Sequence, residues 1–312
     1  MRVFRRIEAS NQVSEKGTVA TIGVFDGVHI GHQTLIKRTV EKSSELSLPS
    51  VVFSFDPTPN EYFSKNQSQL RLSSFRQKFN LIKDLGIENL YIPPFETKME
   101  VLGPNEFIDL HLLKLLNVKY LIIGDDFQFG KNKSGSIIEL ERSGKENDFS
   151  VEAIRTIELN SKRVSSTIIR EALFRNQPEI ANQYLGRNYS IEGRVIYGKQ
   201  IGRTISIPTA NVDIKKINNP LRGVFCVNVS IENDDQLYSG VANIGYKPTV
   251  DGEALTLEVH ILDFNQNIYK SRISIEFLRY LRGEKKFNGI NQLKHQINQD
   301  IDQARKYFKD LT

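Results

Sequence analysis

The sequence contains a single cysteine, Cys226, so the chain cannot form an intramolecular disulfide. Such cysteine usage is typical of proteins in a reducing compartment and predicts a cytoplasmic location. Cys226 lies in the alternating stretch GVFCVNV, which predicts a small buried residue. No apolar run approaches the ~18 residues that a membrane-spanning helix requires. The basic N-terminal stretch MRVFRRIEAS has no continuous apolar segment, so we expect neither a signal peptide nor a membrane partner.

The sequence also lacks long blocks of like charge, internal repeats and low-complexity segments. Lysine and arginine total 42 against 37 acidic residues, which gives a formal net charge of +5 at pH 7. A basic balance favours anionic partners, but the dispersed cations do not form the basic arm typical of nucleic-acid binding. Hydrophobic residues make up 39% and charged residues 25% of the chain, as in globular enzymes. We therefore expect small phosphorylated ligands and no nucleic acid.

The length of the chain favours two domains, and the sequence changes its rhythm once. From residue 18 to about 175, short apolar runs alternate with helix-like segments. The strand-like runs are TVATIGVF, SVVFSF, NLYIPP, KYLIIG and VEAI, and the helix-like segments are HQTLIKRTVEKSSEL, SSFRQKFNLIKDLG and PNEFIDLHLLKLLN. This alternation predicts an α/β domain over residues 1–185, in which helices cover both faces of a parallel sheet.

After Gly186 the pattern consists of strands separated by turn residues. The strand-like stretches are YSIEGRVIYG, GVFCVNVSI, LYSGVANIG, LTLEVHIL and KSRISIEFLRYL. They predict an antiparallel sheet or a small β-barrel over residues 186–312. Residues 288–312 repeat apolar side chains at three- and four-residue steps, from Ile290 to Phe308, which predicts a closing helix with one apolar stripe.

The segment GVFDGVHIGHQ at residues 23–33 joins a predicted strand to a predicted helix. It holds two of the chain's five histidines, His29 and His32, three residues apart. A helix N-terminus offers free backbone N–H groups and partial positive charge, so two imidazoles there suit a phosphate group. They can also stabilise the charge that builds on a phosphoryl group under attack. The alternative is that one histidine packs in the core while the other is a surface polar residue.

Five stretches in chain order resemble the prokaryotic bifunctional FAD synthetases, which join riboflavin kinase to FMN adenylyltransferase. They are GVFDGVHIGHQ, FSFDPTPNEYF (53–63), IIGDDFQFG (122–130), VSSTIIR (164–170) and PTANV (208–212). The tetrapeptide HIGH in the first matches the HxGH signature of nucleotidyltransferases. The resemblance implies a Rossmann-like nucleotidyltransferase domain followed by a β-barrel riboflavin kinase domain. Riboflavin and ATP would give FMN, and FMN and ATP would then give FAD and pyrophosphate.

By this resemblance, His29 and His32 are catalytic and hold ATP phosphates while the FMN phosphate attacks the α-phosphorus. The other residues expected at the nucleotide phosphates are Gly23, Phe25, Asp26, Gly27, Ser165, Ser166, Thr167 and Arg170. Those expected to bind flavin are Phe55, Pro57, Asp126, Phe127 and Phe129. Ordinary helix capping would also account for the serines, and core packing for the aromatic pair in the GDDFQFG stretch. The sequence departs from the family at Thr58, where FAD synthetases often have histidine.

The C-terminal half has its own candidate site in GKQIGRTISIPTAN, residues 198–211. Its glycines, Gly198 and Gly202, permit close approach to a phosphate, and Arg203 belongs to the same basic loop. Thr209 and Asn211 alternate along a predicted strand and offer neutral oxygen ligands that suit Mg²⁺. The resemblance implies that this pair binds Mg-ATP and that Glu258, in LTLEVHILDF, is the base acting on the ribityl hydroxyl of riboflavin. The alternatives are a polar strand edge and a solvated glutamate.

Ser206 stands where riboflavin kinases usually have glycine, and this departure keeps a second interpretation open. The chain would then be an FMN adenylyltransferase whose barrel binds flavin with weak or absent kinase activity. A third interpretation is a non-catalytic flavin-binding regulator. The intact histidine pair, magnesium ligands and glutamate argue against that third interpretation, because a binding protein needs no base and no magnesium site.

Overall fold

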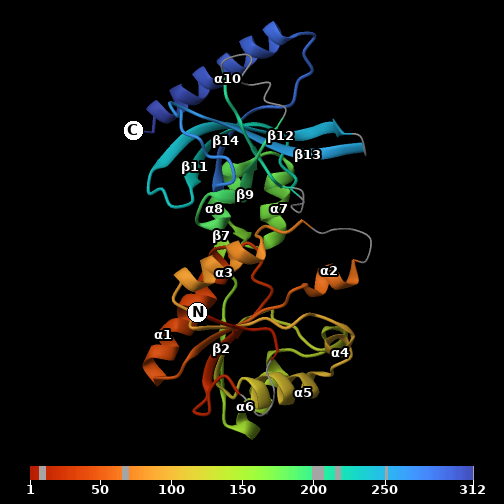
Figure 1. The fold of residues 1–312 in the computed structure, drawn as a ribbon. Helices are drawn as coiled ribbons and strands as arrows, with labels where there is room; N and C mark the ends of the chain where they lie inside the picture. Colours follow the sequence, from red (N-terminus) through yellow and green to blue (C-terminus); the bar gives the residue numbers. More distant parts are fainter. Residues whose placement is uncertain (7–11, 65–69, 199–206, 215–218, 250–251, 312) are drawn as a thin grey trace. The chain divides into compact units, whose positions relative to one another are not determined.

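The computed structural model describes all of the 312 residues except 7–11, 65–69, 199–206, 215–218, 250–251 and 312. The chain folds into two compact units, Met1–Ser166 and Thr167–Thr312 (Figure 1). The expected change of fold class is confirmed, since a parallel sheet comes first and a closed antiparallel barrel follows. Within the described ranges, no helix has both the length and the apolar character needed to cross a membrane.

The first unit is built on a six-stranded sheet in the order β1-β4-β3-β2-β5-β6, and every neighbouring pair is parallel. The strands are β1 (Arg2–Phe4), β2 (Thr18–Ile22), β3 (Ser50–Phe53), β4 (Asn89–Tyr91), β5 (Val118–Gly124) and β6 (Ser150–Ile154). Every residue of β2, β3 and β4 is buried, because both faces of the sheet are covered. Their sequences are therefore largely apolar runs without alternation.

Helices cover both faces of this sheet. On one face, Ile36 of α1 and Ile82 of α3 pack in a cluster with Val52, and on the other, Leu112 and Leu140 pack in a cluster with Phe53. The helical segments are α1 (Ile30–Leu46), α2 (Pro59–Phe63), α3 (Phe75–Asp84), α4 (Thr97–Glu100), α5 (Pro104–Phe107), the π-helical η1 (Ile108–Leu115), the 3₁₀ turn η2 (Lys131–Lys133) and α6 (Ile137–Asn147). A ribbon of β7 (Glu158–Leu159) and β8 (Lys162–Arg163) ends the unit.

The order of the strands reverses at β2. β3 and β4 follow on one side of β2, whereas β5 pairs with its other side. In open α/β sheets, ligands bind outside the carboxyl ends of the strands at such a switch point. The segment GVFDGVHIGHQ follows β2 and the segment DDFQFG follows β5, so both lie at this edge of the sheet.

The second unit is a closed six-stranded antiparallel barrel in the order β10-β13-β12-β11-β14-β9. Its strands are β9 (Tyr189–Ile196), β10 (Ala210–Val212), β11 (Gly223–Ile231), β12 (Leu237–Thr249), β13 (Gly252–Ile261) and β14 (Arg272–Arg282). In β13, Leu257 and Val259 are buried while Glu258 and His260 between and after them are only half-buried, as alternation requires. Cys226 is buried, as the sequence predicted.

Helix α10 (Ile290–Lys309) packs against the barrel strands (Figure 1). Its Ala304 is fully buried in a cluster with Val224 and Val241. The carboxylate of Asp300, which is 2% exposed, accepts hydrogen bonds of 2.8 and 2.7 Å from the guanidinium of Arg282 on β14. The predicted apolar stripe is therefore confirmed at the C-terminal end of the helix, but its first member, Ile290, is 50% exposed.

Helices α7 (Ser166–Phe174) and α8 (Pro178–Leu185) precede the barrel and, apart from Ser166, belong to its unit. The side chain of Asn182 donates to the carbonyl of Phe277 at 2.9 Å and accepts from the N–H of Tyr189 at 2.7 Å. The N–H of Arg222 donates to Asn176 Oδ1 at 2.8 Å. A domain boundary after residue 185, as expected from the sequence, would cut between the segment of α7 and α8 and the barrel residues to which this segment is hydrogen-bonded.

We expect a fragment of residues 167–312 to be more stable than one of residues 186–312. The shorter fragment loses α8, whose Leu185 is fully buried, together with the Asn182 bonds. Burying one large apolar side chain contributes about 1.5–3 kcal/mol, so the free energy of unfolding should fall by about 3 kcal/mol or more. Urea unfolding followed by circular dichroism measures this difference. Equal stability of the two fragments would place the boundary at residue 186.

Candidate active sites at the switch point and on the barrel

Residues 23–29 turn the chain from β2 into α1 through an uncommon backbone conformation. Phe25, Gly27 and Val28 have positive φ angles of 51°, 78° and 42°. Glycine adopts such angles readily, whereas they cost phenylalanine and valine on the order of 1–3 kcal/mol each. Both side chains are buried in one cluster with Ile36, and this packing holds the strained turn in place.

His29 is the N-cap residue of α1. Its backbone is extended, and its Nδ1 accepts a hydrogen bond of 3.3 Å from the N–H of His32. Because Nδ1 is the acceptor, a neutral His29 carries its proton on Nε2, which is then a donor. A Cβ on Gly31 would lie only 3.3 Å from His29 Nδ1. The glycine of HIGH therefore leaves room for the first imidazole to fold back over the first turn of the helix.

The imidazole rings of His29 and His32 stack on each other. Their centroids are 3.6 Å apart and their planes differ by 15°. Burial, and then the neighbouring charges of His29 and Lys78, hold the pKa of His32 well below its usual range, so this ring is neutral at pH 7. Its buried Nδ1 has no hydrogen-bond partner within the described residues. The structure thus brings the two expected catalytic side chains together at the helix N-terminus.

Asp26 supports this corner from within the protein. Its carboxylate is buried and accepts hydrogen bonds from the N–H groups of Leu72 and Ser73, at distances between 3.0 and 3.3 Å. Its carbonyl accepts a bond of 2.9 Å from Ser166 Oγ. Gly23 lies under the ring of Phe25, which a Cβ at Gly23 would approach to 3.2 Å. Through these contacts, Asp26 and Gly23 help to hold the turn that carries the two histidines.

The other residues expected at the phosphates lie around the start of α7. Ser165 directly precedes this helix, and Ser166, Thr167 and Arg170 lie in its first two turns. Ser165 and Arg170 are half-buried, while Thr167 is exposed. The hydroxyl groups of three consecutive residues therefore gather at one helix N-terminus, as the sequence suggested.

Two of the phenylalanines expected to bind flavin are core residues. Phe55 and Phe129 are 8% and 6% exposed and belong to the cluster that contains Phe53 and Phe107. Phe127 is half-buried, and its ring stacks on that of Phe129 with centroids 5.7 Å apart. The sequence left core packing open as the alternative role of Phe129, and the burial of its side chain agrees with that role. The burial of Phe55 does so as well.

An aromatic surface beside Phe55 was missed by the sequence reasoning. The ring of Phe95 makes edge contacts with those of Phe55, Tyr62 and Phe63, at centroid distances of 5.8, 5.4 and 5.7 Å. Phe63 is 59% exposed, which is uncommon for a large aromatic side chain. Tyr62 and Phe63 are part of the FSFDPTPNEYF stretch, but only the fold brings Phe95, which follows β4, against them.

The departure from the family at Thr58 has a structural explanation. Thr58 is the N-cap of α2, and its Oγ1 accepts from the N–H of Glu61 at 3.4 Å while Glu61 Oε2 accepts from the N–H of Thr58 at 2.8 Å. Such a capping box stabilises a helix start. Pro57, just before it, is exposed, and Asp126 in the next predicted flavin stretch forms an ion pair with Arg163.

In the barrel, a polar row crosses three neighbouring strands. Asn211 of β10 lies directly opposite Glu258 of β13, and Glu258 lies opposite Asn243 of β12. Directly opposed residues on antiparallel strands project from the same face, so the three side chains are neighbours. The structure thus joins the expected magnesium ligand Asn211 to the expected base Glu258. It adds Asn243, which the sequence had not singled out.

Gly198 creates space for this row. A Cβ on Gly198 would lie 2.4 Å from the amide nitrogen and 2.7 Å from the amide oxygen of Asn211. Thr209, the other expected magnesium ligand, stands one residue before β10 and is half-buried. Gly202, Arg203 and Ser206 lie outside the described residues.

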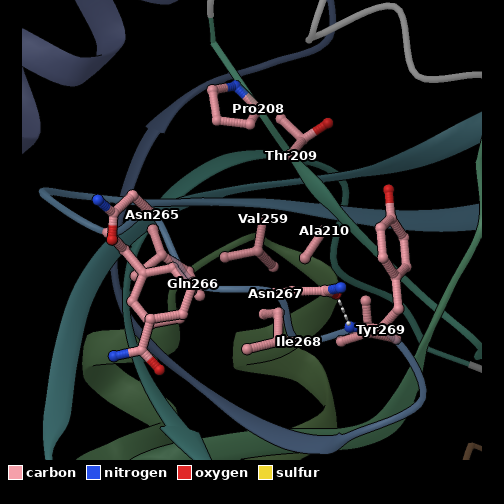
Figure 2. Close-up of a pocket in the computed structure, with 12 residues that line it drawn as sticks. Pro208, Thr209, Ala210, Val259, Asn265, Gln266, Asn267, Ile268 and Tyr269 are labelled. Carbon is pink, nitrogen blue, oxygen red and sulfur yellow. Dashed lines mark hydrogen bonds between the residues drawn. The ribbon is translucent and has the colours of Figure 1, made fainter.

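A pocket of about 270 Å³ opens beside Thr209. Figure 2 shows Pro208 and Thr209 at its rim, with Ala210, Val259 and Ile268 in its wall and Asn265 and Gln266 along one side. Tyr269 closes another side, held by a bond of 3.1 Å from its N–H to Asn267 Oδ1 and by stacking on Tyr197 with ring centroids 4.1 Å apart. The pocket therefore combines an apolar wall with amide groups.

A parallel sheet with a histidine pair at its switch point is the arrangement of a nucleotidyltransferase, and here a separate barrel with its own polar row follows it. Comparisons with known proteins define both units further. Residues 11–168 match the family model for FAD synthetase, and residues 185–308 match that for riboflavin kinase. The chain belongs to the family of bifunctional FAD synthetases.

Curated relatives resemble the chain over its whole length. A protein of Haemophilus influenzae is 39% identical over 308 residues, which cover 99% of both chains. One of Escherichia coli K12 is 36% identical over 308 residues, covering 99% of this chain and 98% of that one. Both are named bifunctional riboflavin kinase/FMN adenylyltransferase. A crystal structure from Streptococcus pneumoniae, described as a macrolide-efflux protein, is 29% identical with a TM-score of 0.87 over 98% of this chain and 99% of that one.

The contact between Gly198 and Asn211 leads to a prediction for the barrel. In Gly198→Ala the new methyl group displaces the Asn211 amide, which can swing aside, so we expect little loss of stability. Misplacement of a positioning group by about 1 Å can cost about 10²-fold in rate, and we expect riboflavin phosphorylation to fall by about that factor. Steady-state kinetics with riboflavin and ATP, beside a thermal unfolding curve, measure both effects. Wild-type kinetics in this variant would show that the placement of Asn211 does not matter.

Proposed function

We propose that this chain makes FAD from riboflavin in two ATP-dependent steps, one in each unit. One observation carries the proposal: each unit contains its own candidate site, and each unit matches the model of a different enzyme family. Stacked histidines lie at a helix N-terminus in the unit that matches FAD synthetase, and an Asn–Glu row lies on the barrel that matches riboflavin kinase. The curated relatives carry both activities in their name.

In the first unit, FMN would be adenylylated. An oxygen of the FMN phosphate attacks the α-phosphorus of ATP, the new P–O bond forms, and the bond to the β-phosphate oxygen breaks to release pyrophosphate. The phosphate of FMN is already ionised, so no base is required. Nε2–H of His29 and the free N–H groups of the α1 N-terminus supply donors for the charge on the reacting phosphates. The hydroxyls of Ser165 and Ser166, which belong to the same unit, would hold the leaving pyrophosphate.

The flavin end of FMN would lie against the aromatic surface of Tyr62, Phe63 and Phe95. Exposed aromatic rings suit the flat isoalloxazine ring, and Phe63 offers the most exposed of these faces. The buried Phe55 and Phe129 would act as the support of this surface, together with the Phe127 ring that stacks on Phe129.

In the barrel, riboflavin would be phosphorylated. Glu258 accepts the proton of the terminal ribityl hydroxyl as its oxygen attacks the γ-phosphorus of ATP, and ADP leaves. Thr209 and Asn211 present neutral oxygen atoms, a donor set that fits Mg²⁺ carried by nucleotide phosphates. When bound, the cation would neutralise charge on those phosphates. Asn211 is placed for this by its position opposite Glu258 and by the space beside Gly198.

The pocket beside Thr209 would take the adenine base of ATP. Its wall of Val259, Ile261 and Ala210 offers apolar contact to a flat base, and the amides of Asn265 and Gln266 offer donors and acceptors to the edge of that base. Because Thr209 lines the same pocket, a nucleotide bound there has its phosphates near the polar row. We further propose a cytoplasmic location and small-molecule partners only, supported by the single buried Cys226 and by the dispersed positive charge.

Incubation of the purified chain with riboflavin, ATP and Mg²⁺, followed by chromatographic separation of flavins, tests the proposal. We expect FMN to appear first and FAD to follow. FAD formed from supplied FMN but never from riboflavin would favour the single-activity adenylyltransferase. Flavin binding without any product would favour the regulator.

The histidine pair allows a prediction specific to the first unit. His29→Ala or His32→Ala should lower the conversion of FMN to FAD by about 10²–10³-fold, as expected when one preorganised charge-stabilising donor is removed. Phosphorylation of riboflavin should persist, because it takes place on the barrel. His295→Ala, on the exposed face of α10, is the matched control and should behave as wild type. Near-normal FAD synthesis in either corner variant would contradict the assignment.

Glu258 allows the corresponding test of the barrel. Glu258→Gln keeps the size of the side chain but removes its basicity, and general-base assistance is worth about 10²–10⁴-fold. We expect riboflavin phosphorylation to fall by about that factor while supplied FMN still becomes FAD at the wild-type rate. One variant and two substrates, assayed side by side, give the answer. An equal loss with both substrates would mean that the two reactions share a site.

A further inference from the structure

The strained turn between β2 and α1 rests on the segment that leads into α3. Asp26 accepts the N–H groups of Leu72 and Ser73, and the N–H of Gly27 donates to Ser73 Oγ at 3.1 Å. Ser74, the next residue, is the N-cap of α3. The start of α3 is therefore fixed directly beneath the histidine corner, and side chains from its first turns reach that corner.

Lys78 of α3 is one of these side chains. It is 6% exposed, and its ammonium donates to the carbonyl of Val24 at 2.9 Å. Ser54 Oγ donates to the same carbonyl at 3.0 Å. Lysine is rarely buried so completely, because removal of an ammonium group from water is costly. Within the described ranges no carboxylate lies within ion-pair distance of Lys78, so its burial is not explained by a salt bridge.

Burial has the largest effect on the pKa of Lys78, and this pKa is lowered overall. Burial lowers the pKa of Lys78, and the carboxylate of Asp26 is the first group that opposes this, followed by those of Asp56 and Glu61, while Arg71 acts in the same direction as burial. The Val24 carbonyl also accepts from an ammonium group. Lys78 in turn contributes, after burial and His29, to the low pKa of His32. A fixed positive charge therefore lies close enough to the histidine pair to be felt there.

We propose that Lys78 is a positioning residue of the adenylyl-transfer site: its ammonium fixes the Val24 carbonyl of the strained corner and places a buried positive charge beside His32 and the incoming phosphates. The proposal rests on the adenylyl-transfer role given above to this corner. A buried charge acts through a low effective dielectric, so it is felt more strongly than a surface lysine would be. Because it is already in place, it needs no reorganisation as charge moves from attacking to leaving oxygens.

Four variants separate the parts of this role. Lys78→Met removes both the hydrogen bond and the charge, and Lys78→Gln keeps a donor for Val24 but removes the charge. Ser54→Ala removes the other donor to Val24 and keeps the charge, and Lys83→Met removes an exposed lysine of the same helix. Each full-length variant is assayed for the kcat and KM values of FMN-to-FAD conversion and for riboflavin phosphorylation, with cooperative unfolding as a check on folding.

We expect both Lys78 variants to lose about 10-fold to 100-fold in adenylylation, less than the loss for a donor that touches the reacting phosphate. The loss should fall on kcat rather than on the KM values for FMN and ATP, because a fixed charge that acts as charge moves between the reacting oxygens stabilises the transition state more than the bound substrates. Ser54→Ala should lose less in kcat than either Lys78 variant, Lys83→Met should match wild type throughout, and riboflavin phosphorylation should be unchanged in all four.

A wild-type kcat, or a loss confined to the KM values, in both Lys78 variants would overturn the inference. Loss of the cooperative unfolding transition in both would overturn it as well, because Lys78 would then serve folding alone. These failures differ from failure of the proposed function. If the unmodified chain makes no FAD from FMN and ATP, the function is wrong; if it does and only the Lys78 variants behave as wild type, the function stands without this inference.

Discussion

The stacking of His29 on His32 is the interaction on which the first site depends, and the stacking itself depends on a backbone that the chain would not adopt alone. Phe25 and Val28 occupy the left-handed region, and the buried position of their side chains keeps them there. Asp26 and the carbonyl of Val24 accept hydrogen bonds, and the N–H of Gly27 donates one, and all three join the turn to the segment that contains the start of α3. Strain stored at a site in this way persists only where the surrounding structure over-determines the conformation. Packing and hydrogen bonding therefore serve the geometry of two imidazoles.

The two units solve different problems in phosphoryl chemistry with different side chains. A phosphate nucleophile is already charged, and we propose that it meets neutral His32 and the donors of a helix N-terminus at the corner. A hydroxyl nucleophile must lose a proton, and we propose Glu258 of the barrel as its acceptor, with Asn211 directly opposite. The same cosubstrate, ATP, would be attacked at its α-phosphorus in one unit and at its γ-phosphorus in the other. Because each unit has its own fold, the positions of the residues in one candidate site place no constraint on the positions of those in the other.

Sequence reasoning predicted the parallel sheet, the antiparallel strands, the closing helix and the histidine pair, because these features are local in the chain. The N-cap at Ser74 and the positive φ of 96° at Gly86 also agree with the helix predicted there. The partners that depend on register or on distant segments were not predictable. Asn243 meets Glu258 only through strand pairing, Phe95 meets Phe63 only after folding, and short β1 (Arg2–Phe4) carries too few residues for a pattern.

Two buried charged side chains in this chain, Asp300 and Lys78, are held by different kinds of partner. Asp300 and Arg282 are paired by two hydrogen bonds, which satisfy the carboxylate and join α10 to the barrel. Lys78 is also buried, yet its hydrogen bond is to a backbone carbonyl of the histidine corner. A methionine of similar length would fill the same space beside Ile82 at lower desolvation cost. The sequence pattern could not single out this lysine, because α3 as a whole reads as an amphipathic helix with several basic residues. Its position beneath Val24 distinguishes it from the exposed Lys83, and only the fold supplies that position.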